Sequence, residues 1–134
     1  MLYNMYDKRQ PKEANMKLQQ SEWIIMEKLW EKSPQTLMQL YHELSDDPGW
    51  SKSTVSTLLK RMCQKHIIDY KQEKAKQYYP CIERGQVAIE ETDRLIDKIY
   101  NGSVSMMMST LIKNHKLSQD DIEELYHLLD TIDE

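Results

Sequence analysis

Apolar positions in the first half of the chain recur every three or four residues, the spacing of one buried face of an α-helix. A first helix is predicted to start at Ser21, a good N-cap, and to end at the Ser33-Pro34 pair. A second is predicted from Thr36, and a third over Ser51–Lys65, after the turn-forming run Asp46-Asp47-Pro48-Gly49. The apolar faces comprise Trp23, Ile24, Ile25, Met26, Leu29 and Trp30 in the first helix, Leu37, Leu40, Tyr41 and Leu44 in the second, and Val55, Leu58, Leu59 and Met62 in the third.

The pattern then changes to two short runs of β-branched and aromatic residues, Ile67-Ile68-Asp69-Tyr70-Lys71 and Gln77-Tyr78-Tyr79-Pro80. The five residues between them suit the loop of a hairpin. Helical spacing returns over residues 83–100 and 104–114, and a last helix is predicted from Ser118 onward. The predicted fold is therefore mainly α with a small β-hairpin wing: a winged helix-turn-helix followed by a helical region.

The polar face of the third helix is short-chained, rich in hydroxyl groups and cationic, and it carries no acidic residue. Serine and threonine are mediocre helix formers, and a solvated helix face normally mixes charges of both signs. In a winged helix-turn-helix this face enters the major groove of DNA, where Lys or Arg can donate to guanine or phosphate, while the wing lies along the backbone. The residues predicted to bind DNA are Lys52, Ser53, Thr54, Ser56, Thr57, Lys60, Arg61, Lys74 and Lys76.

Charge is distributed unevenly along the chain. The formal net charge is −4, from 18 Lys and Arg against 22 Asp and Glu. Residues 1–82 carry +3 and residues 83–134 carry −7, while residues 50–82 alone carry +5. A basic middle segment favours an anion as its partner, although chance clustering on solvated faces is the alternative that charge alone leaves open.

The amphipathic helices after the wing point to self-association. Roughly fifty residues of helix are too few to form a separate well-buried core. Pairing with a second copy would bury their apolar faces and would match a two-fold DNA site. The alternative is that these helices fold back on the winged helix of the same chain. The residues predicted to form the dimer interface are Leu95, Ile99, Met107, Leu111, Ile122, Leu125 and Leu129.

Composition excludes several classes of protein. No apolar run approaches the roughly 18 residues of a membrane span, so no membrane partner is predicted. Cys63 and Cys81 cannot build the disulfide framework of a small secreted domain, and each is predicted to be a single buried cysteine. No phosphate loop, Ser/His/Asp spacing or paired-carboxylate motif is present, so neither an enzyme nor a cofactor is predicted.

These patterns divide the chain into three segments. Residues 1–16 are polar and unpatterned, and are expected to be a disordered extension or the product of a start codon upstream of Met16. They lack the features of an export signal, so the cytoplasm is the expected compartment. Residues 17–82 are predicted to be a winged-helix DNA-binding domain, and residues 83–134 a helical dimerisation region.

Three strings of residues resemble those of a known family. Ser21-Glu22-Trp23 and Trp50-Ser51-Lys52-Ser53-Thr54-Val55-Ser56-Thr57-Leu58-Leu59-Lys60-Arg61-Met62 look like the BlaI/MecI/CopY penicillinase repressors. Leu117-Ser118-Gln119-Asp120-Asp121-Ile122-Glu123-Glu124-Leu125 resembles the BlaI/MecI branch, and the resemblance runs from Met16 to the C-terminus. It implies a homodimeric repressor that binds a pseudo-palindromic operator through its winged helices and dimerises through its C-terminal helices.

The chain departs from the family pattern in three places. Copper-responsive members end in Cys-x-Cys pairs, whereas this chain ends Thr131-Ile132-Asp133-Glu134, so no metal site is predicted. Members controlled by a β-lactam sensor protease are cleaved at an Asn-Phe bond. The matching position here is Thr110-Leu111, which keeps the apolar side and loses the asparagine. His66 stands where relatives have glycine, and a positive φ is expected there.

The predicted function is a dimeric DNA-binding transcriptional repressor that is not an enzyme. Its expected partners are double-stranded operator DNA, a second copy of the chain and, where proteolysis relieves repression, a sensor protease; the context that the resemblance implies is antibiotic resistance. Two alternatives stay open: a winged-helix protein-interaction regulator without specific DNA binding, and a metal-responsive repressor. For Arg61 the alternative to DNA binding is a guanidinium that braces the hairpin or a helix end.

Overall fold

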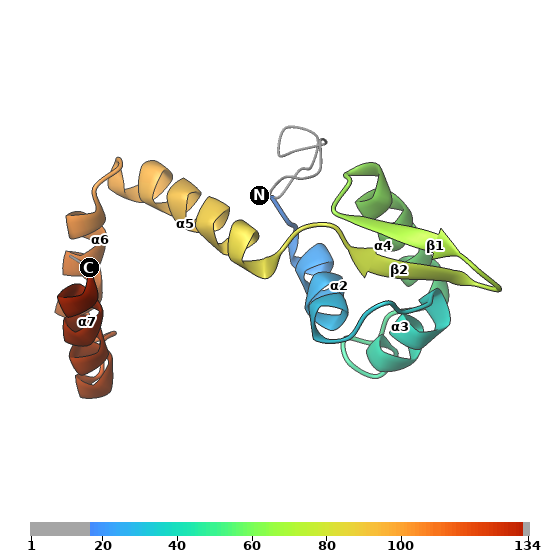
Figure 1. The fold of residues 1–134 in the computed structure, drawn as a ribbon, viewed down its shortest axis with the longest axis horizontal. Coiled ribbons are helices and arrows are strands. Elements are labelled where there is room, and N and C mark those ends of the chain that lie inside the picture. Colours follow the sequence, from blue (N-terminus) through green and yellow to red (C-terminus); the bar gives the residue numbers. More distant parts are fainter. Residues whose placement is uncertain (1–16, 133–134) are drawn as a thin grey trace. The chain divides into compact units, whose positions relative to one another are not determined.

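A computed structural model describes residues 17–132 of the chain (Figure 1). Along the chain lie α2 (Gln20–Glu31), α3 (Leu37–Leu44), α4 (Lys52–Gln64), β1 (Ile68–Gln72), β2 (Lys76–Pro80), α5 (Arg84–Tyr100), α6 (Val104–Lys113) and α7 (Gln119–Thr131). This order confirms the predicted fold class, three helices and a hairpin wing followed by further helices. The extension predicted for residues 1–16 lies outside the described residues.

The chain forms two compact units, which meet between Glu91 and Thr92, within α5. The sequence-based boundary after residue 82 falls just before this helix. The structural division comes later because Ile82 and Val87 belong to the apolar core of the first unit. The start of α5 is therefore part of the winged helix.

The core of the first unit is formed by α2, α3, α4 and the hairpin. The predicted apolar face of α4 is buried in full. In α2 the buried face is instead centred on Ile25, Met26 and Leu29, because Glu22 occupies the next buried position, and Trp23 and Trp30 lie half-buried at its edge. The core residues are Ile25, Met26, Leu29, Leu40, Leu44, Val55, Leu58, Leu59, Met62, Ile67, Ile68, Tyr78, Ile82 and Val87.

Thr36, Ser51 and Ser118 cap the helices that they were predicted to open. The prediction of Ser21 as the cap of the first helix is wrong, since α2 begins two residues earlier and Gln19 is its N-cap. The reason is that the Glu22 carboxylate accepts a hydrogen bond from the Gln19 backbone N–H at 2.9 Å, which satisfies the start of the helix there.

The wing is an antiparallel hairpin whose register runs from the pair Ile68 and Pro80 to the pair Gln72 and Lys76. Its loop contains residues 73–75, fewer than predicted, because the ladder extends to Lys76. Gln35 forms an isolated antiparallel β-bridge with Tyr78 of β2. Its backbone N–H donates to the Tyr78 carbonyl at 2.9 Å, and its carbonyl accepts from the Tyr78 N–H at 2.8 Å. This bridge joins the wing to the segment between α2 and α3.

α4 ends in the conformation expected from the sequence. His66 has a φ of 64°, in the left-handed region, which confirms the predicted positive φ. Its N–H donates to the Cys63 carbonyl at 3.0 Å, and the Ile67 N–H donates to the Met62 carbonyl at 3.2 Å. These two bonds form the Schellman motif that closes a helix and turns the chain toward the next element.

The two cysteines differ in exposure. Cys63 is half-buried, and burial, aided by the nearby Asp69 charge, raises the pKa of its thiol. Cys81 is exposed, so the prediction that it is buried is wrong. The physical reason is the alternation of side chains along an extended segment: Tyr78 and Ile82 face the core, and Cys81 between them does not.

The second unit, residues 92–132 as described, contains no fully buried large apolar side chain. Its helices are the end of α5, with α6 and α7 after it. Its exposed apolar residues are Leu95, Ile99, Val104, Met106, Ile112, Tyr126, Leu128, Leu129 and Ile132. Such a stretch of helix does not have an apolar core of its own.

Candidate nucleic-acid interface

α4 brings seven of the predicted DNA-binding residues onto one helix. At its start, the Ser51 hydroxyl accepts a hydrogen bond from the Thr54 N–H at 3.2 Å and lies 3.1 Å from the Thr54 hydroxyl. Thr54 and Arg61 are half-buried and the other five residues are exposed. We call this set the polar face of α4: Lys52, Ser53, Thr54, Ser56, Thr57, Lys60 and Arg61.

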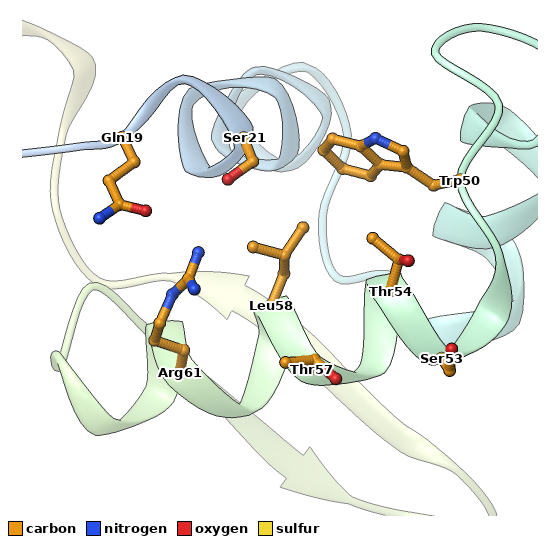
Figure 2. Close-up of a pocket in the computed structure, with 8 residues that line it drawn as sticks. All are labelled: Gln19, Ser21, Trp50, Ser53, Thr54, Thr57, Leu58 and Arg61. Atoms are coloured by element: carbon orange, nitrogen blue, oxygen red, sulfur yellow. The ribbon is translucent and has the colours of Figure 1, made fainter.

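A hollow of about 460 Å³ runs along one edge of this face (Figure 2). Ser53, Thr54, Thr57 and Arg61 line it from α4, as predicted DNA-binding residues. The other lining residues were not predicted as site residues: Gln19, Ser21, Trp50 and Leu58. The available signal was that Ser21, Trp50 and Leu58 belong to two of the three strings that resemble the penicillinase repressors.

A buried ion-pair cluster joins α2 to the end of α4. Glu22 accepts hydrogen bonds from Lys65 Nζ at 2.6 Å and from Arg61 Nε at 3.3 Å. Burial by itself raises the pKa of the Glu22 carboxyl, but the Gln19 N–H and the two cations outweigh it and hold the pKa below its ordinary value. Sequence reasoning missed Glu22 as a partner of these cations. Arg61 thus contacts the first turn of α2, which matches the alternative role of bracing a helix end. Part of its side chain also lines the hollow.

The wing presents its cations in different ways. Lys74 is exposed in the loop between the strands. Lys76 is exposed on β2, with its ammonium 4.5 Å from the centre of the Tyr70 ring, an attractive cation–π distance. Tyr70 in turn lies against Tyr78, with ring centroids 5.7 Å apart. Lys76 is thus held over an aromatic ring, whereas Lys74 is exposed at the tip of the hairpin.

The residues predicted to form the dimer interface lie on the three helices of the second unit. Ile122, Leu125 and Leu129 line an apolar hollow of about 300 Å³ between α6 and α7, whose other lining residues are Met108, Ile112, Leu117 and Tyr126. Leu95 and Ile99 are exposed on α5, and Met107 and Leu111 are half-buried on α6. Thr110 and Leu111, the predicted cleavage position, lie inside α6.

Two further observations concern other kinds of site. Within residues 17–132, no group of three or more His, Cys, Asp or Glu side chains is arranged to hold a metal ion. In the same part of the chain, no helix is both long enough and apolar enough to cross a membrane.

Known proteins similar to this chain point to one family. The family model described as penicillinase repressor matches residues 18–131. The methicillin resistance regulatory protein MecI of Staphylococcus aureus (strain N315) is 31% identical over 110 residues, which cover 81% of this chain and 89% of MecI. A penicillinase repressor of Bacillus licheniformis is 27% identical over 111 residues, covering 82% of this chain and 87% of that protein. The solution structure of the DNA-binding domain of the repressor BlaI covers 53% of this chain and 89% of that domain, with 25% identity and a TM-score of 0.49. With its family match extending over both units, this chain belongs to the penicillinase repressor family.

Proposed function

We propose that the chain is a homodimeric transcriptional repressor that binds a pseudo-palindromic DNA operator. The observation that carries the proposal is the polar face of α4, which combines exposed hydroxyl groups and cations and has no acidic residue. Hydroxyl groups near the start of such a helix can read base edges, and the cations contact guanine or phosphate. The wing adds Lys74 and Lys76 for the DNA backbone.

Dimerisation is supported by the second unit. Its apolar side chains are exposed along α5, α6 and α7, and a single copy leaves them in water. A second copy would cover them and would place two winged helices on two half-sites. We propose that Leu95, Ile99, Met107, Leu111, Ile122, Leu125 and Leu129 contribute to that interface.

The names of two relatives suggest which genes this chain regulates. MecI is named as a methicillin resistance regulatory protein, and the Bacillus licheniformis relative as a penicillinase repressor. By analogy, we propose that the genes repressed here belong to a response to β-lactam antibiotics. Induction would then act by removing the repressor from its operator.

Relief by proteolysis at Thr110-Leu111 is part of the proposal and has a structural requirement. The Thr110 carbonyl accepts a hydrogen bond from the Asn114 side chain at 2.8 Å, and the Thr110 hydroxyl donates to the Met106 carbonyl at 3.1 Å. A protease binds its substrate as an extended strand, so α6 must open locally before this bond can be cleaved. Cleavage there would cut the dimer-forming region and weaken operator binding.

The experiment that tests repressor function compares DNA affinities of the full chain. The duplexes are promoter fragments of its own and neighbouring genes and a scrambled duplex of equal length and composition, at about 150 mM salt. We expect one promoter fragment to bind at least about a thousandfold more tightly than the scrambled duplex. Replacing Thr57 should change the preferred sequence, whereas replacing Lys60 should weaken binding to every duplex. Equal affinity for all duplexes would contradict the proposal.

A further inference from the structure

Among the described residues of the first unit, one charged side chain is completely buried. Glu22, in the first turn of α2, has 0% of its surface exposed. Its Oε1 accepts hydrogen bonds from the Gln19 backbone N–H at 2.9 Å and from Lys65 Nζ at 2.6 Å, and its Oε2 accepts from Arg61 Nε at 3.3 Å. Arg61 and Lys65 both come from the end of α4. A single buried carboxylate therefore contacts two cations of the helix that carries the proposed DNA-binding face.

The two carboxylate oxygens of Glu22 have different partners, and only Oε2 contacts Arg61. A buried carboxylate must be paired and hydrogen-bonded, and Oε1 already meets that need through Gln19 and Lys65. Oε2 contacts Arg61 through Nε, while 41% of the arginine side chain remains exposed. Among residues 17–132, the terminal Nη groups of Arg61 have no hydrogen-bond partner. Because a guanidinium is planar and rigid, a bond at Nε sets the direction of these remaining donors.

Arg61 lines the hollow at the opposite end of α4 from Ser53 and Thr54. Figure 2 shows its guanidinium extending from α4 toward the first turn of α2, in the hollow that it shares with Thr54 and Thr57. Arg61 belongs to the last turn of α4, whereas the residues that read bases lie near the start of such a helix. Its expected acceptor is therefore a phosphate oxygen of the DNA backbone.

Resting on the proposed function, we infer that Glu22 is a positioning residue for DNA binding. Its Oε2 holds Arg61 so that the free Nη groups donate to a backbone phosphate. In the absence of this contact the arginine side chain would sample several rotamers, and ordering it on DNA would reduce the affinity. Glu22 thus acts on DNA through Arg61, although it carries the same sign of charge as DNA.

The direction of the effect separates positioning from simple electrostatics. The substitution Glu22→Gln removes a negative charge from the DNA-binding unit, so long-range attraction alone would tighten DNA binding. Loss of positioning weakens binding instead. The sign of the change in Kd therefore distinguishes the two explanations.

The experiment measures the Kd of the full chain by fluorescence anisotropy, on an operator duplex and on a scrambled duplex, over a range of salt concentrations. The variants are Glu22→Gln, Arg61→Gln and the double variant, each checked for folding by circular dichroism at the assay temperature. We expect each single substitution to weaken binding about tenfold, the loss of a charge-assisted hydrogen bond. The double variant should bind no more weakly than Arg61→Gln alone, because Glu22 acts through Arg61.

Two further variants make the test independent of fold stability. Arg61→Lys keeps the charge and lacks the planar group and Nε, and it should lose almost as much affinity as Arg61→Gln. Lys65→Gln is the matched control, since it breaks the ion pair on Oε1. It should lower stability and weaken binding of the folded protein far less than Arg61→Gln does, because only the long-range attraction of one cation is lost.

Three results would overturn the inference. They are Glu22→Gln binding at least as tightly as the wild type, the double variant showing the product of the two single losses, and Arg61→Lys binding like the wild type. A phosphate contact is independent of sequence, so these comparisons can also be made on the scrambled duplex. Equal affinity of the wild type for both duplexes would contradict the proposed repressor function while leaving this test intact.

Discussion

At the scale of single residues, Glu22 links the stability of the first unit to pH. Its pKa is lowered in the folded chain, so its contribution to stability is present above about pH 4.5 and is lost as the pH falls through the folded-state pKa. We expect Glu22→Gln to destabilise the protein at pH 7 by about 3 kcal/mol, since two cations lose a buried partner. The difference from the wild type should shrink as the pH falls below about 4.5 and through the lowered folded-state pKa.

The measurement is urea unfolding followed by tryptophan fluorescence at several pH values. Glu27→Gln provides the control, because Glu27 pairs with Arg84 at 2.8 Å and is 48% exposed. An exposed ion pair of this kind contributes less than about 1 kcal/mol. Parallel pH curves for Glu22→Gln and the wild type would show that Glu22 is not responsible for the acid-sensitive part of the stability.

His66 offers a second residue-scale prediction, from its φ of 64°. A left-handed conformation is strained for a residue with a Cβ atom and unstrained for glycine. We expect His66→Gly to stabilise the protein by about 1 kcal/mol and His66→Val to destabilise it by at least as much. In denaturant unfolding, Gln64→Gly, inside the last turn of α4, should have the opposite sign and cost about 1 kcal/mol. A loss of stability in His66→Gly would contradict the strain argument.

These residues also show what local sequence patterns can and cannot predict. The positive φ of His66 is expected from the glycine that relatives have at this position, and the polar face of α4 follows from the periodicity of one helix. The pairing of Glu22 with Arg61 joins positions 39 residues apart, and no local pattern contains it. A glutamate early in a helix is normally a favourable, solvated residue, which is why its burial could not be predicted.

At the scale of elements, we expect the wing to contribute to the salt dependence of DNA binding. Lys74 is exposed in the loop of the hairpin, where a cation can contact the DNA backbone without reading sequence. We expect Lys74→Gln to weaken binding to operator and scrambled duplexes alike. The slope of log Kobs against log salt should decrease in magnitude by about 2 for a dimer, one contact for each wing.

Lys116→Gln is the matched control for the wing, since it removes an exposed cation from the second unit. It should leave the salt slope unchanged. Equal changes in the two variants would mean that Lys74 acts only through the net charge of the protein.

Elements were easier to predict than their ends. α2, α3, α4 and the hairpin follow from hydrophobic periodicity, because each packs one face on a shared core. The start of α2 differs from prediction because a local capping contact sets it, and the wing loop is shorter because cross-strand pairing extends to Lys76. Gln19 caps α2 through the Glu22 carboxylate, and Lys76 joins the strand while lying over Tyr70.

At the scale of the whole molecule, the net positive charge and the exposed apolar helices lie in different parts of the chain. Residues 50–82, with +5, supply α4 and the wing, and residues 83–134, with −7, supply the exposed apolar helices. Two acidic regions can associate only if apolar burial outweighs their repulsion, and that repulsion is weakened by salt. Dimer formation should therefore strengthen with salt, while DNA binding weakens with it.

Leu129 tests whether dimerisation is required for DNA binding. It is 60% exposed and lines the apolar hollow between α6 and α7, so an aspartate there would place a charge in the proposed interface. In sedimentation equilibrium at micromolar concentration, we expect the wild type to be a dimer and Leu129→Asp to be monomeric. Its operator affinity should fall by at least about a hundredfold, because the second half-site is no longer engaged by a tethered copy.

His127→Asp adds the same charge about 200° around α7, on the opposite side of the helix, and should remain a dimer with unchanged affinity. Dimeric Leu129→Asp, or equal dissociation of both variants, would contradict the assignment of this surface to the dimer interface.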